Sequence, residues 1–331
     1  MLQLNNNTPF AAEIALFPNA DGVDTLFVMV KAGFKLGSRW TLLNEQMSPQ
    51  AEDEYYGEPA KSSLKRASDF HPGKPNTDII MSGSACAPEQ KTVEQLDVSL
   101  SVGNTRKTVR VFGDRQWRNG TITKPVPFTT MPLVYENAFG GLQTISGKIH
   151  RAEERNPVGK GYRGSCKRAD MESQNLPNLE DPGGLIQDID DTPVPACFAP
   201  VAPNWQPRVA YAGTYDEKWE AVRAPYLPGD YDARFMNSAH PDLVYPGYLQ
   251  GGEPLIITGM HPGGSMQLSL PVLRFNCKVR MAVAQHAIKL NMESLLLEPN
   301  QLKLYMVWRA ALVVDKDALN VEEVFISLSR A

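Results

Sequence analysis

The chain has 331 residues, of which 42% are hydrophobic and 21% charged, and its formal net charge is −4. A chain of this length can bury about three quarters of its unfolded surface, so a stable core needs neither a disulfide nor a structural metal. The 33 basic and 37 acidic residues form no long block of one sign, which argues against nucleic acid or an anionic membrane surface as a partner.

The N-terminal stretch, MLQLNNNTPFAAEIALF, has no basic start and no long apolar core, so we do not expect a secretory signal. No apolar run approaches the roughly 20 residues that span a bilayer. The four cysteines are far apart in sequence and form no Cys-x-x-Cys pair, which favours reduced thiols over a disulfide or a zinc site. We therefore expect a cytoplasmic protein without a cofactor, a metal or a membrane partner.

The first strands are predicted from alternation of apolar residues. Residues 26, 28, 30, 32, 34 and 36 are all apolar, which predicts a half-buried strand within 23–36. The segments LDVSLSV and KTVRVFG, joined through Gly103 and Asn104, predict a hairpin. The stretch MPLVYENAFGG, 131–141, begins as a short strand and reaches a turn or a close backbone approach at Gly140 and Gly141. Glu136 is expected to hold that corner by binding a backbone amide or an arginine.

The middle of the chain is expected to be long and irregular, because 13 of the 26 prolines lie between Pro177 and Pro262. Short helices are predicted around YDEKWEAVR and YDARFMNSA. Near the C-terminus, ESLLLEPNQLKLYMVWRAAL predicts a strand, a turn at 298–301 and a second strand, and VEEVFISL predicts a last strand. We expect a mainly β fold: antiparallel sheets packed as a sandwich in one domain, 1–331, whose ends close on each other.

Common catalytic motifs are incomplete in this sequence. The five histidines are scattered singly, and GGSMQ, 263–267, lacks the last glycine and the strand-to-helix setting of a reactive serine. The segment NPVGKGY, 156–162, lacks the longer glycine loop, the Lys-Ser/Thr pair and the helix of a phosphate-binding loop, so it predicts a tight turn. An acidic cluster at 188, 190 and 191 predicts a solvated loop.

Two charged pairs and three tryptophans are candidates for structural roles. Asp230 and Asp232 resemble the start of a calcium loop, but Arg234 occupies the position of a further ligand, which favours an Asp–Arg pair. Asp114 and Arg115 either orient a substrate or form an ion pair that fixes a strand end, with Trp117 covering it, and we favour the ion pair. Large apolar rings predict core positions for a further set of tryptophans, namely Trp205, Trp219 and Trp308.

A series of segments, taken in chain order, forms a pattern that is specific enough to indicate one protein family. The series is GDRQW, PFTTMPLVYENAFGG, NPVGKGY, LPNLE, PACFAPVAPNWQPRVAYAGTYDEKW, APYLPGDYDARFMNSAHPDLVYPGYLQGGEPL, LSLP and VWRAAL. It resembles the DUF2169 family of bacterial proteins from about Phe10 to Trp308. The resemblance implies an adaptor, or effector chaperone, of the type VI secretion system, which binds a toxin effector in the cytoplasm and helps to load it onto a VgrG-type spike. The chain departs from the family pattern at Gly252, where an acidic residue is lost, and at His240, where a small residue is commoner.

The resemblance points to a set of motif residues with structural or partner-binding roles: Asp114, Arg115, Trp117, Tyr135, Glu136, Trp205, Arg208, Trp219, Asp230, Asp232 and Arg234.

An alternative is a carbohydrate-binding or glycoside-processing protein that uses Glu136, Asp230, Asp232 and Glu253. Glycoside hydrolysis needs two carboxyl groups about 5–10 Å apart across a cleft, whereas pairing with Arg115, Arg208 or Arg234 would weigh against it. A third possibility is a spike-like structural component, for which a trimer or an extended assembly is expected.

Overall fold

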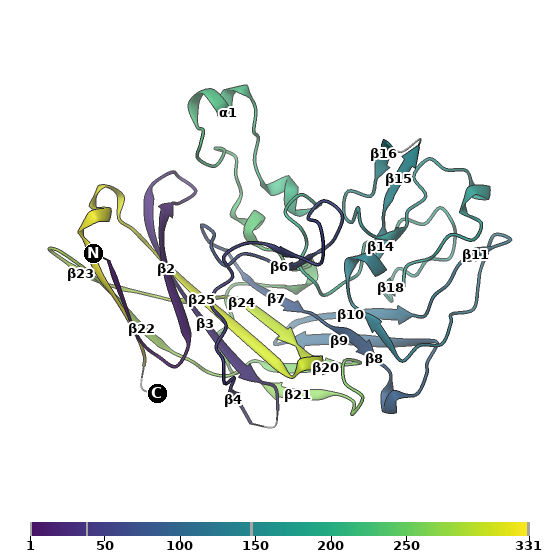
Figure 1. Ribbon diagram of the computed structural model, residues 1–331, viewed down its shortest axis with the longest axis horizontal. Coiled ribbons are helices and arrows are strands. Elements are labelled where there is room, and N and C mark those ends of the chain that lie inside the picture. Colours follow the sequence, from purple (N-terminus) through teal and green to yellow (C-terminus); the bar gives the residue numbers. More distant parts are fainter. Residues whose placement is uncertain (1, 38, 146–147, 330–331) are drawn as a thin grey trace.

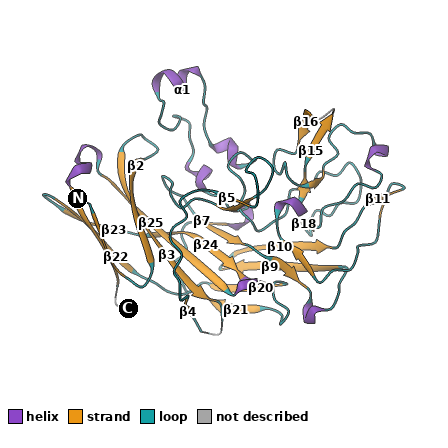
Figure 2. Ribbon diagram, viewed as in Figure 1, coloured by secondary structure: helices purple, strands orange, loops and turns teal. Residues whose placement is uncertain are grey.

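The computed structural model describes residues 2–37, 39–145 and 148–329, and its architecture is mainly β (Figure 1, Figure 2). Three large sheets carry most of the strands, and most of the pairs are antiparallel. The predicted fold class is therefore confirmed, with the addition that several pairs are parallel, including β1 with β26 and β7 with β24.

The largest sheet has seven strands and joins distant parts of the chain. Its order is β19 (Val244–Tyr245), β7 (Thr77–Met81), β24 (Asn291–Glu298), β25 (Lys303–Val313), β3 (Asp24–Lys35) and β2 (Ala11–Pro18), and β4 (Thr41–Leu42) also pairs with β3. The predicted turn between β24 and β25 is the 3-10 helix η7 (Pro299–Gln301). The C-terminal strands therefore lie in the middle of this sheet.

The second sheet has five strands, in the order β18 (Leu179–Glu180), β10 (Thr105–Phe112), β9 (Gln95–Val102), β20 (Pro254–Thr258) and β21 (Met266–Ser269). The predicted hairpin is confirmed, because Val102 of β9 lies opposite Thr105 of β10. Gly103 in the connecting turn has a φ of +54°, a conformation that favours glycine.

The third sheet has four strands, in the order β1 (Gln3–Asn7), β26 (Val321–Leu328), β22 (Phe275–Met281) and β23 (Gln285–Ile288). The pairing of β1 with β26 brings Gln3 opposite Glu323, and in Figure 1 the two chain ends lie on the same side of the molecule. The N-terminal and C-terminal strands thus pair with each other, as expected.

Short strand pairs and 3-10 helices make up the rest of the described chain. The pairs are β5 (Glu54–Tyr55) with β6 (Leu64–Arg66), β8 (Ser84–Cys86) with β13 (Thr130–Pro132), β11 (Trp117–Arg118) with β12 (Thr121–Ile122), β14 (Phe139–Gly140) with β17 (Lys160–Gly161), and β15 (Leu142–Ile145) with β16 (Lys148–Ala152). The helices are α1 (Glu217–Val222), η1 (Pro88–Gln90), η2 (Tyr135–Asn137), η3 (Arg168–Met171), η4 (Arg208–Tyr211), η5 (Ala233–Met236), η6 (Pro241–Leu243) and η8 (Asp315–Asn320). The predicted irregular middle region is thereby confirmed.

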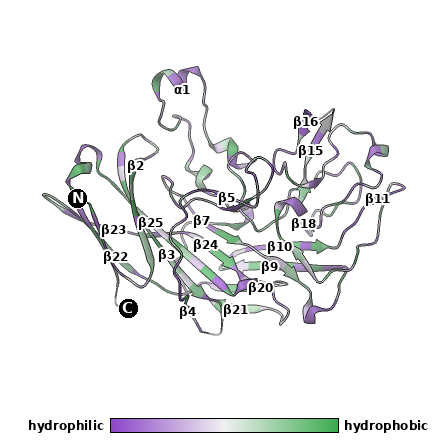
Figure 3. Cartoon of the chain, viewed as in Figure 1, coloured by the Kyte–Doolittle hydropathy of each residue, from purple (hydrophilic) through white to green (hydrophobic). Residues whose placement is uncertain are grey.

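One continuous apolar core connects the three large sheets. It contains Val30 of β3, Leu100 of β9 and Ile326 of β26. A smaller cluster lies around Trp117 and Phe139. In Figure 3 the hydrophobic residues follow the large sheets, whereas the connections between them are more hydrophilic.

The prediction that β3 is half-buried is wrong, because both of its faces are buried. The even-numbered side chains enter the apolar core, as predicted. The opposite face carries Phe27, Met29 and Lys31, which are also buried. A polar segment, 68–78, lies over that face and contacts it through an ion pair between Lys31 and Asp69.

Candidate functional site

An arm, residues 212–232, projects from the body of the molecule and carries α1 at its tip (Figure 1). Asp216 begins α1 by accepting a hydrogen bond from the Trp219 amide at 2.8 Å. The indole of Trp219 donates to the Tyr226 carbonyl at 2.8 Å and lies edge-on to the Tyr215 ring. The predicted helix is confirmed, but the prediction that Trp219 is a core residue is wrong, because its side chain is only half-buried.

Polar contacts join the two ends of the arm to each other. Asp230 accepts hydrogen bonds from the amide and the hydroxyl of Thr214, at 2.9 and 2.7 Å, and these bonds lower the pKa of its carboxyl. Asp232 begins η5 and pairs with Arg234 at 2.6 Å, and hydrogen bonds from Arg234 lower the Asp232 pKa. The predicted Asp–Arg pair is therefore confirmed at Asp232, whereas Asp230 uses Thr214 instead.

A pocket of about 190 Å³ lies at the foot of the arm, where η4 and η5 meet. Most of its lining is apolar, with Val201, Pro207, Ala239 and Val244 among the residues. Arg208 also lines the pocket, although it is only 7% exposed. Of the predicted motif residues, Arg208 and Arg234 line this pocket.

Two backbone carbonyls hold Arg208 in place. Its Nε donates to the Phe235 carbonyl at 2.7 Å and its Nη1 to the Val201 carbonyl at 2.9 Å. Burial lowers the pKa of the guanidinium. None of the carboxylates in the described ranges lies within the 4 Å ion-pair distance of Arg208, so the expected pairing of Arg208 with a carboxylate is wrong.

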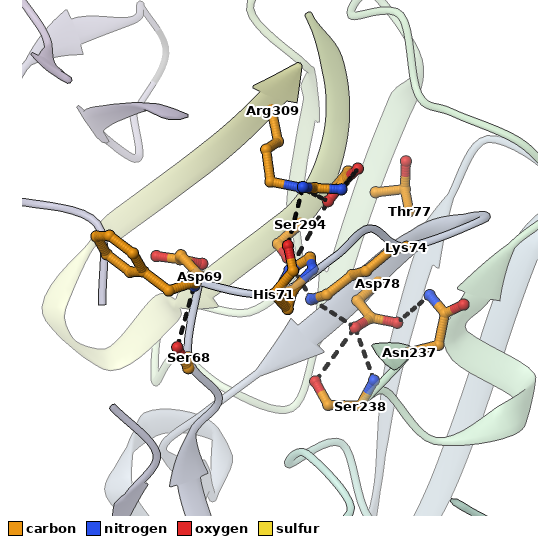
Figure 4. Close-up of polar contacts among 12 residues, drawn as sticks. Ser68, Asp69, His71, Lys74, Thr77, Asp78, Asn237, Ser238, Ser294 and Arg309 are labelled. Carbon is orange, nitrogen blue, oxygen red and sulfur yellow. Dashed lines mark hydrogen bonds and ion pairs between the residues drawn. The ribbon is translucent and has the colours of Figure 1, made fainter. Parts of the chain in front are cut away.

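A buried group of ion pairs, which we call the charge cluster, lies between the seven-stranded sheet and the segment 68–78. Figure 4 shows the part of it around Lys74, Asp78 and Arg309. The charge cluster comprises the pairs Lys31–Asp69 at 3.1 Å, Lys74–Asp78 at 2.8 Å and Arg309–Glu293 at 2.8 Å. All six side chains are almost fully buried. Each charge thus has an opposite charge beside it, which is what buried ionised groups require.

The charge cluster is connected to the pocket through Asp78. Its carboxylate accepts hydrogen bonds from the Asn237 side chain at 2.8 Å and from the Ser238 amide at 2.8 Å (Figure 4). Asn237 lies directly after η5 and also lines the pocket. The position of η5, and with it the shape of the pocket, is therefore fixed by a carboxylate of the central sheet.

His71 lies beside the charge cluster and is fully buried (Figure 4). Desolvation holds its pKa well below the usual value, and the positive charges of Lys74, Arg309 and Arg208 lower it further. His71 is therefore a neutral imidazole at physiological pH. Its backbone carbonyl accepts a hydrogen bond from Arg309 at 2.9 Å, so it also helps to hold that guanidinium.

The charge cluster matches none of the motifs considered above, although the sequence contains a signal for it. Lys31, Glu293 and Arg309 interrupt otherwise apolar strands, in FVMVKAGF, NMESLLL and VWRAAL. A charge inside a buried strand needs a partner of opposite sign, so these interruptions predict buried pairs. Sequence alone does not say which charges pair, because the partners are up to 38 residues apart within the cluster.

Hydrogen bonds from Ser63 hold the corner around Glu136. The Glu136 carboxylate accepts hydrogen bonds from the amide and the hydroxyl of Ser63, at 2.8 and 2.7 Å, so it binds a backbone amide as predicted. Tyr135 packs edge-on to Trp205, at 5.4 Å between ring centroids, and both are buried core residues. The short strand ends earlier than predicted, because Tyr135 already belongs to η2.

The two glycines after Glu136 mark a close backbone approach. A Cβ added to Gly140, whose φ is +152°, would lie 2.0 Å from the Asn156 carbonyl oxygen. The predicted turn in NPVGKGY is only partly confirmed, because Lys160 and Gly161 form strand β17, which pairs with β14.

The ion pair predicted between Asp114 and Arg115 is wrong. Arg115 instead pairs with buried Glu180 and stacks on the Phe112 ring. Asp114 accepts a hydrogen bond from Asn178 at 3.0 Å. Trp117 is buried, as predicted.

Three further observations concern metal-binding groups, the cysteines and the helices. Within 2–37, 39–145 and 148–329, no three His, Cys, Asp or Glu side chains are grouped so that they could hold a metal ion. The four cysteines are free thiols. None of the helices in these ranges has the length and apolar character needed to cross a bilayer.

Comparison with known proteins identifies one family. The model of a family described as "Uncharacterized protein conserved in bacteria (DUF2169)" matches residues 21–309, which is most of the chain. Neither the curated proteins nor the solved structures contain a match to the chain.

Proposed function

Because the chain belongs to the DUF2169 family of bacterial proteins, we propose that it is a non-enzymatic adaptor, or effector chaperone, of the type VI secretion system. In this role it binds a toxin effector in the bacterial cytoplasm and helps to load it onto a VgrG-type spike. The family match supports the resemblance from which this role is inferred. The observation that carries the proposal is the projecting arm, whose apolar side chains are exposed.

Three large apolar side chains of the arm face solvent. Val222 at the end of α1 is 80% exposed, Tyr215 is 55% exposed, and Tyr226 is also exposed. Tyrosine and tryptophan are enriched in protein interfaces because they combine a large apolar area with a polar group. Exposed apolar residues gathered on one projecting segment are typical of a partner-binding surface.

The arm is also held firmly enough to present that surface. The Arg223 guanidinium donates to the carbonyls of Leu227 and Ala20, at 2.8 and 2.9 Å. The ring of Tyr226 packs over Gly22, where an added Cβ would lie 3.0 Å from the ring. An interface whose backbone is already fixed loses less conformational entropy on binding than a flexible one.

The carboxylates considered for glycoside chemistry have separate partners. Glu136 binds Ser63, Asp230 binds Thr214, and Asp232 binds Arg234. Glu253 accepts a hydrogen bond from the Gln250 amide at 2.7 Å. This arrangement favours the adaptor over the glycoside-processing alternative, which needs two carboxyls facing each other across a cleft.

Affinity capture from the native bacterium tests the proposal. The tagged protein should recover a toxin effector or a VgrG-type spike protein, identified by mass spectrometry, through an interface of about 800 Å² per partner. Val222→Asp should abolish recovery, whereas Val283→Asp, at a residue that is 95% exposed far from the arm, should not. Deletion of the gene should stop delivery of the effector. Recovery of neither protein, together with unimpaired delivery in the deletion strain, would refute the adaptor role.

A further inference from the structure

Arg208 is a buried cation that has no ion-pair partner among the described residues. The guanidinium of Arg208 forms hydrogen bonds only with two neutral carbonyls among the described residues, and its Nη2 donates to none of them. Burying an unpaired charge is costly, and a single Arg placed in a pocket is the usual means of recognising a carboxylate or a phosphate.

The surrounding charges leave Arg208 as an additional cation. The charge cluster balances its own charges, three positive against three negative. The carboxylates that act on Arg208 from a distance are Asp53 and Asp78. Asp53 accepts a hydrogen bond from the Ser68 amide, and Asp78 is already shared by Lys74 and the 237–238 segment. Both carboxylates thus already accept hydrogen bonds away from Arg208.

The second cation at the pocket is already neutralised. Arg234 lines the rim, where it lies over the Tyr211 ring at 4.3 Å and pairs with Asp232 at 2.6 Å. Arg208 is therefore the charge that remains for a ligand inside the pocket.

The shape of the pocket restricts the ligand. Its volume of about 190 Å³ exceeds the roughly 150 Å³ of a cavity that holds benzene. Val201, Ala239 and Val244 provide an apolar wall beside the guanidinium. A group that fills this space combines one anionic end with a small apolar part.

We propose that the pocket at the foot of the arm binds a carboxylate of a partner polypeptide, with the carboxylate on Arg208 and the adjacent apolar atoms against Val201 and Val244. This site rests on the proposed adaptor function and specifies it: the arm provides contact area, and the pocket anchors one acidic group. The carboxylate belongs either to a chain terminus or to an acidic side chain, and these two sources differ in the groups that flank it.

Small probes test the site on the isolated full chain. Protein labelled with ¹⁵N-arginine is titrated while the Nε–H resonance of Arg208 is followed by NMR. N-acetyl-leucine should shift this resonance saturably, with a dissociation constant in the millimolar range expected for a ligand of this size. N-acetyl-leucinamide, which lacks the carboxylate, and acetate, which lacks the apolar part, should each bind at least about tenfold more weakly. N-acetyl-glutamic acid α-amide, with its carboxylate on a side chain, distinguishes the two sources.

Two variants locate the binding in this pocket. Arg208→Gln should weaken binding of N-acetyl-leucine, measured by calorimetry, at least about tenfold. Arg280→Gln, at an exposed arginine of β22, should leave it unchanged. Val244→Phe fills the pocket and keeps both hydrogen bonds of Arg208, so it decides the matter if the Arg208 variant does not fold. It should also prevent binding.

The proposal is overturned if the amide probe or acetate binds as tightly as N-acetyl-leucine, or if Val244→Phe binds it like the unaltered protein. The test is independent of effector capture. If the probes do not bind while the protein still recovers an effector, the pocket assignment fails and the adaptor role stands. If the probes bind, but neither an effector nor a spike protein is recovered and the deletion strain still delivers the effector, the adaptor role fails instead.

Discussion

The pair Glu293–Arg309 offers the sharpest test of the charge cluster. Arg309 donates to both oxygens of Glu293, at 2.8 and 3.1 Å, and the arginine is only 5% exposed. Glu293→Gln keeps the shape of the side chain but leaves the guanidinium charge buried and unpaired. Breaking a buried pair in this way costs about 3–5 kcal/mol, so the free energy of unfolding should fall by that amount.

Urea denaturation, followed by tryptophan fluorescence, measures the change, since urea does not screen charges as a salt would. The matched control is Glu322→Gln, whose partner Arg280 is 58% exposed, and exposed pairs contribute about 0–1 kcal/mol. The double variant Glu293→Gln, Arg309→Met should recover most of the loss, because it removes the unpaired charge. A loss below about 1 kcal/mol for Glu293→Gln would refute the reasoning that the pair is desolvated.

Two further predictions concern backbone fit and pH. Gly140→Ala places a Cβ 2.0 Å from the Asn156 carbonyl oxygen, so the free energy of unfolding, measured by chemical denaturation, should fall by about 2 kcal/mol or more. The control is Gly184→Ala, where a Cβ has open space and the free energy of unfolding should change by less than about 0.5 kcal/mol. Equal effects of the two substitutions would contradict the close approach at Gly140. His240 is buried, and desolvation together with Lys107 lowers its pKa to about 4. In the unfolded chain the pKa of this histidine is about 6.5, so below that pH the unfolded state binds more protons than the folded state. Stability is therefore lost as pH falls from about 6.5 to 4. His240→Asn keeps an acceptor that can cap the helix. Between pH 7 and 4, the free energy of unfolding of this variant should fall by about 3 kcal/mol less than that of the unaltered protein. The same pH dependence in both proteins would refute the assignment.

Strand positions were predictable from the sequence because alternation and turn residues are local signals. The β9–β10 hairpin and the β24–β25 turn were located correctly. Burial of the second face of β3 was not predictable from alternation, because it depends on the segment 68–78, which is distant in sequence. The pairing of β7 with β24 was not predicted for the same reason, since more than 200 residues separate the partners.

The candidate site was predicted only in part. Arg208, Asp232 and Arg234 were identified as motif residues, and all three lie at the foot of the arm. Their roles differ: Asp232 and Arg234 pair, whereas Arg208 binds carbonyls and faces the pocket. Which cation is neutralised depends on distances of a few ångströms between separate loops, and sequence spacing does not encode such distances.

The strand order of the large sheet bears on when the protein becomes foldable during synthesis. Residues of β24 and β25 are inserted between β7 and β3, so until about residue 313 has been made, these two strands each have an unpaired edge. Unpaired edges of apolar strands are prone to aggregate, and contacts between distant residues form slowly. The nascent chain therefore spends almost all of its synthesis with these edges unpaired, and an arrest of translation shortly before β24 would yield a product that cannot close its central sheet.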